Sequence, residues 1–186
     1  MTIGATDSDE GSRVGGSPPL AIDDTLLSTH DYLLTLGVDT ADWLRGRELS
    51  VFLRRGFSIA DDDLVYPDIG ARVVIHPPSP RATNGRGVLA SIGSAALVPY
   101  VGEEALSFVR IGDEPLLIQN EPSYAKPALD DGLRFLFQLN DEGFPVDGPV
   151  GEFLDGDYLF GYGSLYFYGR VDDAGARDVV PGFLDF

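Results

Sequence analysis

The chain has 186 residues, of which 30 are acidic and 13 basic, and its formal net charge at pH 7 is −17. It has no basic patch that could displace counterions from a nucleic acid, so the composition excludes direct nucleic-acid binding. The absence of cysteine excludes disulfides, thiolate metal sites and a cysteine nucleophile. No apolar run approaches the ~18 residues of a membrane span, and the first residues lack signal-peptide features. We therefore expect a cytoplasmic protein that does not engage a membrane.

The acidity of the chain allows two interpretations. Lys126 is the single lysine among the 13 cationic residues, while hydrophobic residues still make up 44% of the chain. In molar salt the Debye length falls to ~3 Å, so a carboxylate-rich surface keeps a protein soluble without strong self-repulsion. The alternative is an acidic surface directed at a basic partner. Because the scarcity of lysine fits salt adaptation better, we expect an origin in a salt-adapted organism.

The first 21 residues differ in composition from the rest of the chain. They are rich in Gly, Ser, Asp and Pro and carry too little apolar surface to offset the entropy lost on ordering. We expect residues 1–21 to form a disordered acidic tail. The remaining residues, 22–186, suit one domain by length and show no internal repeat.

Helical patterns occur early in the predicted domain. Between a capping residue at Asp23 or Asp24 and a terminating Gly37, apolar residues recur at intervals of three or four, which predicts a helix. A second helix is predicted from Asp39 toward Gly56. Residues 49–53 within it fit a strand equally well, so both assignments remain open for that segment.

From residue 65 onward the pattern changes to short strands separated by turn signals. The predicted strands cover residues 72–76, 88–92, 96–101, 106–111, 116–119, 133–139, 158–160, 165–171 and 183–186. A long surface loop is predicted over residues 140–157. These elements predict an α+β fold, with one or two N-terminal helices followed by a mostly antiparallel, twisted multi-strand β-sheet system.

Motifs of common enzyme classes are missing from the sequence. His30 and His76 are the only histidines, so a three-histidine metal site cannot form, and no His-Glu-x-x-His segment occurs. No serine has glycine at both −2 and +2, and no phosphate-binding loop is present. A Ser-His-Asp site stays open. We predict no catalytic residue and no cofactor, and we expect both histidines to be structural.

Acidic clusters are candidates for binding a hard cation through oxygen ligands. The best pair flanks the predicted loop and consists of Asp141, Glu142, Asp155 and Asp157. Carboxylate oxygens suit Ca²⁺ and Mg²⁺, but no cluster has EF-hand spacing. With 30 acidic residues in the chain, such clusters also arise from composition alone. A solvated surface is therefore the favoured interpretation, and a metal site is the alternative.

Aromatic and amide residues near the C-terminus are the candidate binding residues. Alternation along a strand places Tyr166 and Tyr168 on one face, and Tyr162 precedes them. Tyrosines suit a partly exposed interface, although packing in a sheet is the simpler interpretation. Gln119 and Gln138 end or interrupt apolar strands, where a buried amide needs hydrogen bonds. We predict that these five residues bind a partner, with a structural role as the alternative.

Three segments resemble a known family. Residues 109–119 (VRIGDEPLLIQ), 133–140 (LRFLFQLN) and 160–167 (FGYGSLYF) are similar in order and spacing to segments of the YwqG-like family, the domain of unknown function 1963. Asp113 stands where that pattern has a glycine, so the chain resembles a divergent or shortened member.

The resemblance implies an extensive twisted β-sheet fold with no established enzymatic activity. Some similar proteins lie among bacterial conflict-system genes, which implies a binding or immunity role. The positions that match the family pattern are Gly112, Pro115, Gln119, Gln138, Gly163 and Tyr166.

Three functional hypotheses follow from the sequence. The first is a cytoplasmic, non-enzymatic protein-binding module, with an immunity-like role as one form of it. Its interface would combine the tyrosine face with residues 140–157. The second is a cation- or small-molecule-binding enzyme that uses surface carboxylates, and the third is a structural subunit whose acidity serves solubility. The sequence predicts no particular oligomeric state.

Overall fold

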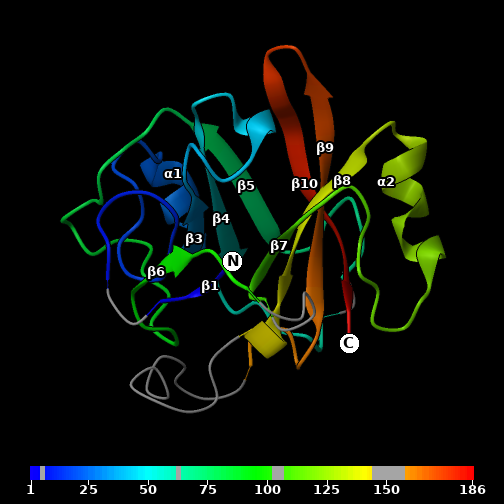
Figure 1. Cartoon of the computed structure of the whole chain (residues 1–186). Helices are drawn as coiled ribbons and strands as arrows, with labels where there is room; N and C mark the ends of the chain where they lie inside the picture. Colours follow the sequence, from blue (N-terminus) through cyan, green and yellow to red (C-terminus); the bar gives the residue numbers. More distant parts are fainter. Residues whose placement is uncertain (5–6, 62–63, 102–106, 144–157) are drawn as a thin grey trace.

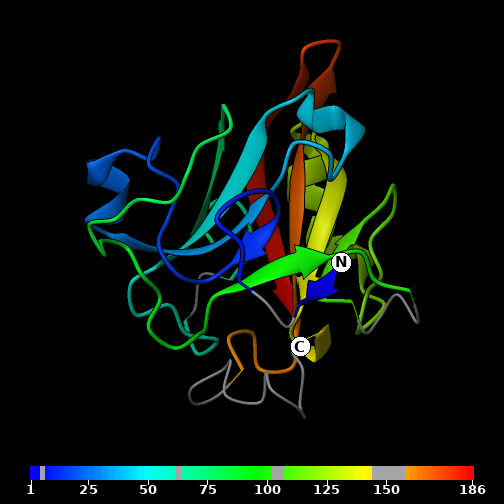
Figure 2. The ribbon, with the colours of Figure 1, turned by 60° about the vertical axis from the view of Figure 1, so that its left-hand side comes forward.

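Two antiparallel β-sheets, packed face to face, make up the fold. The computed structural model describes residues 1–4, 7–61, 64–101, 107–143 and 158–186. Within these ranges, six strands form one sheet in the order β1-β6-β2-β3-β4-β5, and four form a second in the order β10-β9-β8-β7 (Figure 1). In Figure 2 the second sheet is seen nearly edge-on beside the first.

The strands and helical turns have the following bounds. The first sheet contains β1 (Thr2–Ile3), β2 (Arg13–Val14), β3 (His30–Leu36), β4 (Glu48–Arg54), β5 (Ala71–His76) and β6 (Ala95–Val98). The second contains β7 (Val109–Ile111), β8 (Arg134–Asn140), β9 (Ser164–Asp172) and β10 (Gly175–Asp185). The helical segments are α1 (Asp24–Leu27), η1 (Asp42–Leu44), η3 (Pro122–Ala125), α2 (Lys126–Asp130) and η4 (Asp141–Gly143).

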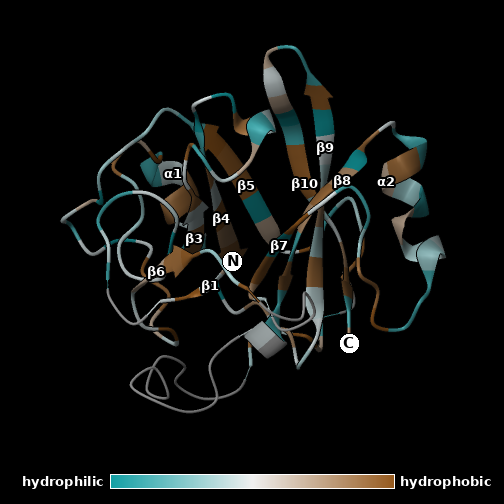
Figure 3. Cartoon of the chain, viewed as in Figure 1, coloured by the Kyte–Doolittle hydropathy of each residue, from teal (hydrophilic) through white to brown (hydrophobic). Residues whose placement is uncertain are grey.

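The main apolar core lies between the two sheets. Leu34 and Val51 of the first sheet belong to the same buried cluster as Phe137, Leu165 and Phe167 of the second. The rings of Phe137 and Phe167 stack with their centroids 4.3 Å apart. Apolar residues, brown in Figure 3, accordingly mark the strands. Smaller clusters lie on the outer faces, one beside α1 and one beside α2.

Hydrogen bonds also join the two sheets at both margins. At one margin, the backbone N–H of Val109 in β7 donates to the carbonyl of Met1, which precedes β1. At the other, residues 64–66 run along β10, and the N–H of Tyr66 donates to the carbonyl of Gly182 at 2.6 Å. These bonds partly cover the edges of the second sheet at β7 and β10, so fewer backbone groups there are left to pair with another chain.

The predicted helix at the start of the domain is wrong, and with it the α+β class. Asp23, one of the two predicted capping residues, caps a helix, but α1 is a single turn, and β3 begins at His30. From Tyr32 to Leu36 every residue of β3 is buried. A strand buried on both faces carries a near-continuous apolar run, which can imitate helical spacing. The fold is mostly antiparallel β-sheet, without the expected N-terminal helices.

The second predicted helix is replaced by a 3₁₀ turn and a strand. η1 is followed by Arg45 in a left-handed conformation and by Gly46 with φ 76°. β4 then covers residues 49–53, so the strand assignment that fitted this segment equally well is the one observed. The longest helical segment runs instead from η3 into α2, where the sequence analysis predicted no helix.

Several predicted strands are confirmed. The predictions over residues 72–76, 96–101, 106–111, 133–139, 165–171 and 183–186 overlap β5, β6, β7, β8, β9 and β10. Residues 116–119, predicted as a strand, form none and cross the outer face of the second sheet instead.

The N-terminal residues that we expected to form a disordered tail take part in the first sheet. β2 lies between β6 and β3 and pairs with both, and Arg13 and Val14 are fully buried. β2 gains backbone hydrogen bonds from both neighbouring strands once the sheet has formed. The composition of the segment gives no sign of these bonds.

Candidate functional site

A row of polar side chains crosses the outer face of the second sheet near one end. Asn140 of β8 pairs in register with Ser164 of β9, and Ser164 pairs with Asp185 of β10. In the next row Gln138 pairs with Tyr166. Because residues in register point to the same face of a sheet, these side chains form one connected surface. All five are buried beneath residues 116–119.

Gln138 holds the covering segment to the sheet. Its Oε1 accepts the backbone N–H of Leu116 at 2.8 Å, and its Nε2 donates to the Leu116 carbonyl at 3.1 Å and to Asn140 Oδ1 at 2.7 Å. Ser164 donates to the same Asn140 oxygen, and the Tyr166 hydroxyl donates to the Leu116 carbonyl, each at 2.8 Å. The amide is therefore satisfied, and the network fixes the segment in place.

Asp185 makes the second attachment of this segment. Its Oδ2 accepts the backbone N–H groups of Ile118 at 2.9 Å and Gln119 at 3.1 Å. Its Oδ1 is buried without a hydrogen-bond partner among the described residues. Beside it, the Gln119 side chain donates to the carbonyl of Phe186. Oδ2 of this buried carboxylate thus holds the covering segment, while Oδ1 accepts no hydrogen bond from the described residues.

Exposed apolar side chains surround the network. Leu116 is 41% exposed, Ile118 50%, Tyr162 66% and Phe186 51%. We call these four residues the apolar rim. Leu116, Ile118 and Tyr162 line a cavity of about 300 Å³ together with Gln138, Asn140, Ser164 and Leu117. Phe186 lies beside Gly163, the residue after Tyr162, since a Cβ on that glycine would lie 2.8 Å from the Phe186 Cβ.

A second buried carboxylate positions Tyr162. Asp141 Oδ2 accepts the backbone N–H of Phe160 at 2.6 Å and that of Tyr162 at 3.2 Å. Burial raises the pKa of Asp141 to about 7, against the lowering effect of these two hydrogen bonds. Tyr162 itself has φ 67°, a backbone conformation that residues other than Gly, Asn and Asp rarely adopt. The carboxyl group thus fixes a turn that directs the aromatic ring to solvent.

The structure brings four of the five predicted binding residues together, with different exposures. Gln119, Gln138, Tyr162 and Tyr166 lie at the site just described. Tyr166 is fully buried, and burial, reinforced by the charge of Asp185, raises its pKa to about 12. Tyr168 lies on the same sheet face but packs with Phe135 and Phe183 near α2, and burial raises its pKa. Among the three predicted tyrosines, only Tyr162 is available to a partner.

The predicted metal site is only partly within the described residues. Asp155 and Asp157 lie outside them, as does the side chain of Glu142, and Asp141 is occupied as above. Elsewhere in the described chain, no group of three or more His, Asp or Glu side chains is placed to hold a metal ion.

The outer face of the first sheet carries another buried polar chain. Tyr32 donates to Thr35, and the hydroxyls of Thr35 and Ser50 and the His76 Nε2 follow at successive distances of 2.8 Å. His76 Nδ1 lies 2.8 Å from the carbonyl of Pro77. Since a carbonyl only accepts, Nδ1 donates to Pro77, and in the neutral imidazole Nε2 then accepts from Ser50.

This arrangement does not support a nucleophilic serine. Ser50 is fully buried, and Glu48 lies 3.8 Å from His76 Nδ1, farther than the Pro77 carbonyl. The chain of hydroxyls instead satisfies the polar groups of a covered sheet face, which agrees with the structural role expected for His76. The partners of His76 in this chain could not be recognised from the sequence, because only the strand register brings them together.

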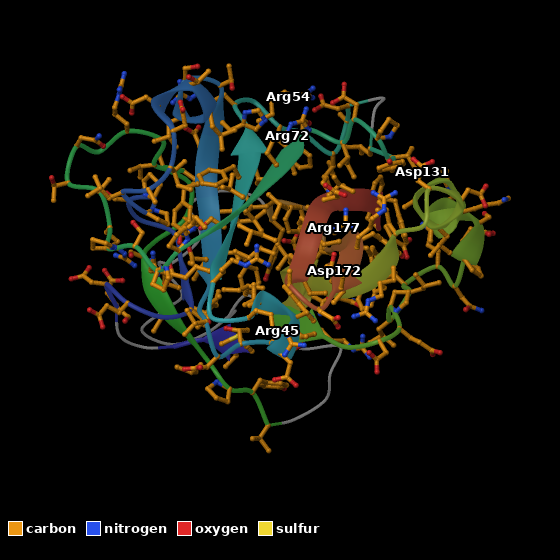
Figure 4. The ribbon with its side chains drawn as sticks, turned by 90° about the horizontal axis from the view of Figure 1, so that it is seen from above. Arg45, Arg54, Arg72, Asp131, Asp172 and Arg177 are labelled. Atoms are coloured by element: carbon orange, nitrogen blue, oxygen red, sulfur yellow. The ribbon has the colours of Figure 1, made fainter. Side chains whose placement is uncertain are left out.

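Ion pairs occupy other parts of the surface. Figure 4 labels Arg54 and Arg72 of the first sheet and Asp172 and Arg177 of the β9–β10 hairpin. Arg177 lies 3.0 Å from Asp172, Arg54 lies 2.7 Å from Asp61, and Arg72 lies 3.3 Å from Asp68. Exposed pairs of this kind contribute little to stability and leave these cations neutralised. We therefore place the candidate site at the apolar rim.

Fold and site together define a two-sheet antiparallel β protein with a hydrogen-bonded pocket edged by apolar side chains. The chain matches no model of a known protein family, no curated protein and no solved structure. Membership of the YwqG-like family accordingly stays a prediction. Of the helices in the described residues, none has both the length and the apolar character to cross a lipid bilayer.

Proposed function

We propose that this chain is a cytoplasmic, non-catalytic protein-binding module whose apolar rim docks a basic segment of a partner protein. The observation that carries the proposal is the gathering of Leu116, Ile118 and Tyr162, all at least 41% exposed, around one pocket, with the exposed Phe186 beside Gly163. Contiguous exposed apolar surface edged by polar groups is characteristic of interaction sites. A salt-adapted origin remains part of this proposal.

The rigidity of the floor supports binding. Gln138 and Asp185 together accept or donate four hydrogen bonds to the backbone of residues 116–119. A surface that is ordered before binding loses less conformational entropy when the partner arrives. Tyr162 supplies a large side chain of the type that carries binding energy in interfaces.

The basic character of the partner segment follows from charge. The chain carries a net charge of −17, which favours encounter with cationic partners and disfavours acidic ones.

The positions that resemble the YwqG-like pattern lie at the same place. Gln119, Gln138, Gly163 and Tyr166 all belong to the site or its support. An immunity-like role, in which the partner is a toxic protein, is a specific form of this proposal.

A displayed library of random peptides, selected against the full chain, tests the proposal. Enriched peptides are expected to combine basic and apolar residues. Their binding should weaken about tenfold or more in the double variant Ile118→Ser, Tyr162→Ser, because both changes remove apolar contact area. Leu129→Ser is the matched control, since Leu129 on α2 is also 50% exposed. Peptides that bind the double variant as well as the natural chain, or a selection without enrichment, would overturn the proposal.

A further inference from the structure

We infer that the pocket at the apolar rim takes a neutral amide group, to which Asn140 donates the second hydrogen of its Nδ2. The inference rests on the proposed function, because the amide would belong to the docked partner segment. It could be the side chain of an asparagine or glutamine, or a peptide group of the main chain. The inference assigns to the pocket a polar specificity that apolar contact alone does not provide.

The side chain of Asn140 has one hydrogen-bonding position left. Its Oδ1 accepts from Gln138 Nε2 at 2.7 Å and from the Ser164 hydroxyl at 2.8 Å, and its Nδ2 donates to the Ser107 carbonyl at 2.7 Å. Since an amide nitrogen carries two hydrogens, the second one has no acceptor among the described residues. Asn140 is only 4% exposed and lines the cavity, so we take the cavity as the route by which an acceptor reaches this hydrogen.

Hydrogen-bond acceptors line the same cavity. Gln138 Oε1 accepts a single bond, from the N–H of Leu116, although a carbonyl oxygen has two lone pairs. The Ser164 hydroxyl uses its hydrogen on Asn140 and can still accept. The Tyr162 hydroxyl makes no hydrogen bond to the described residues and can act in either role. A group that both accepts and donates therefore matches the lining better than a group with one role.

The charge of the lining favours a neutral group over an ion. Among the described residues that line the cavity, none has a charged side chain. An ion that enters would lose hydration without meeting an opposite charge in the lining, and its desolvation costs far more than that of an amide. The carbon atoms next to the amide would lie against Leu116 and Ile118, and the basic residues of the partner segment would act outside the pocket.

Titration of the ¹⁵N-labelled full chain with five small probes, in buffer of high salt concentration, tests the inference. Butyramide carries a primary amide and N-methylpropionamide a peptide-like amide. The ketone 2-pentanone keeps the carbonyl without an N–H, and butyrate and butylammonium are ions of similar size. We expect saturable shifts of the Asn140 side-chain NH₂ resonances and of the Ile118 amide with an amide probe.

The affinities of the probes are expected to follow the hydrogen-bond inventory. The ketone should bind about threefold more weakly than the better amide, because it lacks the N–H donor. The two ions should bind about tenfold more weakly or less, because the lining offers them no opposite charge. The stronger of the two amides shows whether a side chain or the main chain of the partner supplies the group.

Asn140→Asp provides the matched substitution. The aspartate keeps the shape of the side chain and can still accept from Gln138 and Ser164, but it has no N–H to donate. We expect the amide probes to bind this variant about tenfold more weakly, while Asn84→Asp, which adds the same charge at an exposed position, leaves their affinity unchanged. If Asn140→Asp fails to fold, the comparison of the five probes on the natural chain decides alone.

A ketone or an ion that binds as tightly as the better amide would overturn the inference, as would the absence of saturable shifts or full retention of binding in Asn140→Asp. These outcomes are separable from the proposed function. Selected peptides that depend on Ile118 and Tyr162, together with probes that show no preference for an amide, would refute only the assignment to Asn140. Peptides that do not depend on the rim would refute the docking site itself.

Discussion

At the scale of single residues, two buried carboxylates hold the chain segments that frame the pocket. Asp185 attaches residues 116–119, and Asp141 attaches the turn that carries Tyr162. Each has a second oxygen without a partner among the described residues. Burying a carboxyl group costs desolvation energy, and the cost is larger for its charged form.

Asp141 is expected to make the protein less stable as the pH rises. Its pKa is about 7 in the folded chain against 3.8 for the ordinary group. Between these values the folded state keeps a proton that the unfolded state releases. The free energy of unfolding therefore falls across this window, by up to about 1.4 kcal/mol per pH unit. Denaturant unfolding at a series of pH values measures this slope.

Asp141→Asn cannot titrate, so its stability relative to the natural chain should rise between about pH 4 and pH 7. Asp172→Asn is an opposite control. The N–H of Ala174 and the Arg177 side chain lower the pKa of Asp172, so its contribution is lost as the pH falls. Parallel stability curves for Asp141→Asn and the natural chain would refute the effect assigned to Asp141.

At the scale of elements, the segment of residues 116–119 depends on the sheet beneath it. Gln138→Leu should destabilise the protein by about 1–3 kcal/mol, because the backbone N–H of Leu116 loses its acceptor and the Leu116 carbonyl keeps only the Tyr166 hydroxyl. Hydrogen exchange at the Leu116 amide should accelerate. Gln119→Leu removes only the bond to Phe186 and is expected to change stability by less than about 0.5 kcal/mol. Equal effects of the two substitutions would contradict the role given to Gln138.

The two family-like glycines are predicted to differ in tolerance. A Cβ on Gly163 would lie 2.4 Å from the Asp185 carbonyl oxygen and 2.6 Å from that of Phe160. Gly163→Ala should therefore force the backbone apart and cost about 1–3 kcal/mol. Gly112→Ala would meet the end of the flexible Arg110 side chain, at 3.3 Å, and should be nearly neutral. Thermal unfolding of both variants compares them, and a tolerated Gly163→Ala would refute the close approach.

At the scale of the whole molecule, the N-terminal segment belongs to the folded domain. Val14→Asp places a charge at a fully buried position of β2 and should abolish cooperative unfolding or lower its midpoint strongly. Val101→Asp is the control, because Val101 is 98% exposed. Circular dichroism during heating distinguishes the variants. Similar curves for both would show that residues 1–21 behave as the tail that their composition suggests.

Sequence patterns predicted β8 and β9, whose aromatic residues favour strands, although both strands are buried over most of their length. Gln138 stood out because an amide interrupts an apolar run. β3 is buried in the same way, but its leucines recur at intervals that also fit a helix. No element was predicted over η3 and α2, which contain Pro122 and Pro127, although proline is compatible with a first helical turn.

The site was predictable only in part, for a related reason. Tyr162 and Gln119 could be chosen by residue type and position. Asp185 could not, because its role arises from register with Ser164 and from a covering segment 66 residues away in sequence. The exposure of Ile118 likewise depends on residues 116–119 lying over the sheet, where the sequence predicted another strand.

Hydrogen–deuterium exchange of the full chain with and without an excess of a selected peptide tests the central claim most directly, because it locates the docking site without any substitution. The account predicts that protection gained on binding is confined to residues 116–119 and 158–163 and to the end of β10. Protection that appears instead along α2 or at the turn between β9 and β10, with no change at Ile118 and Tyr162, would contradict it.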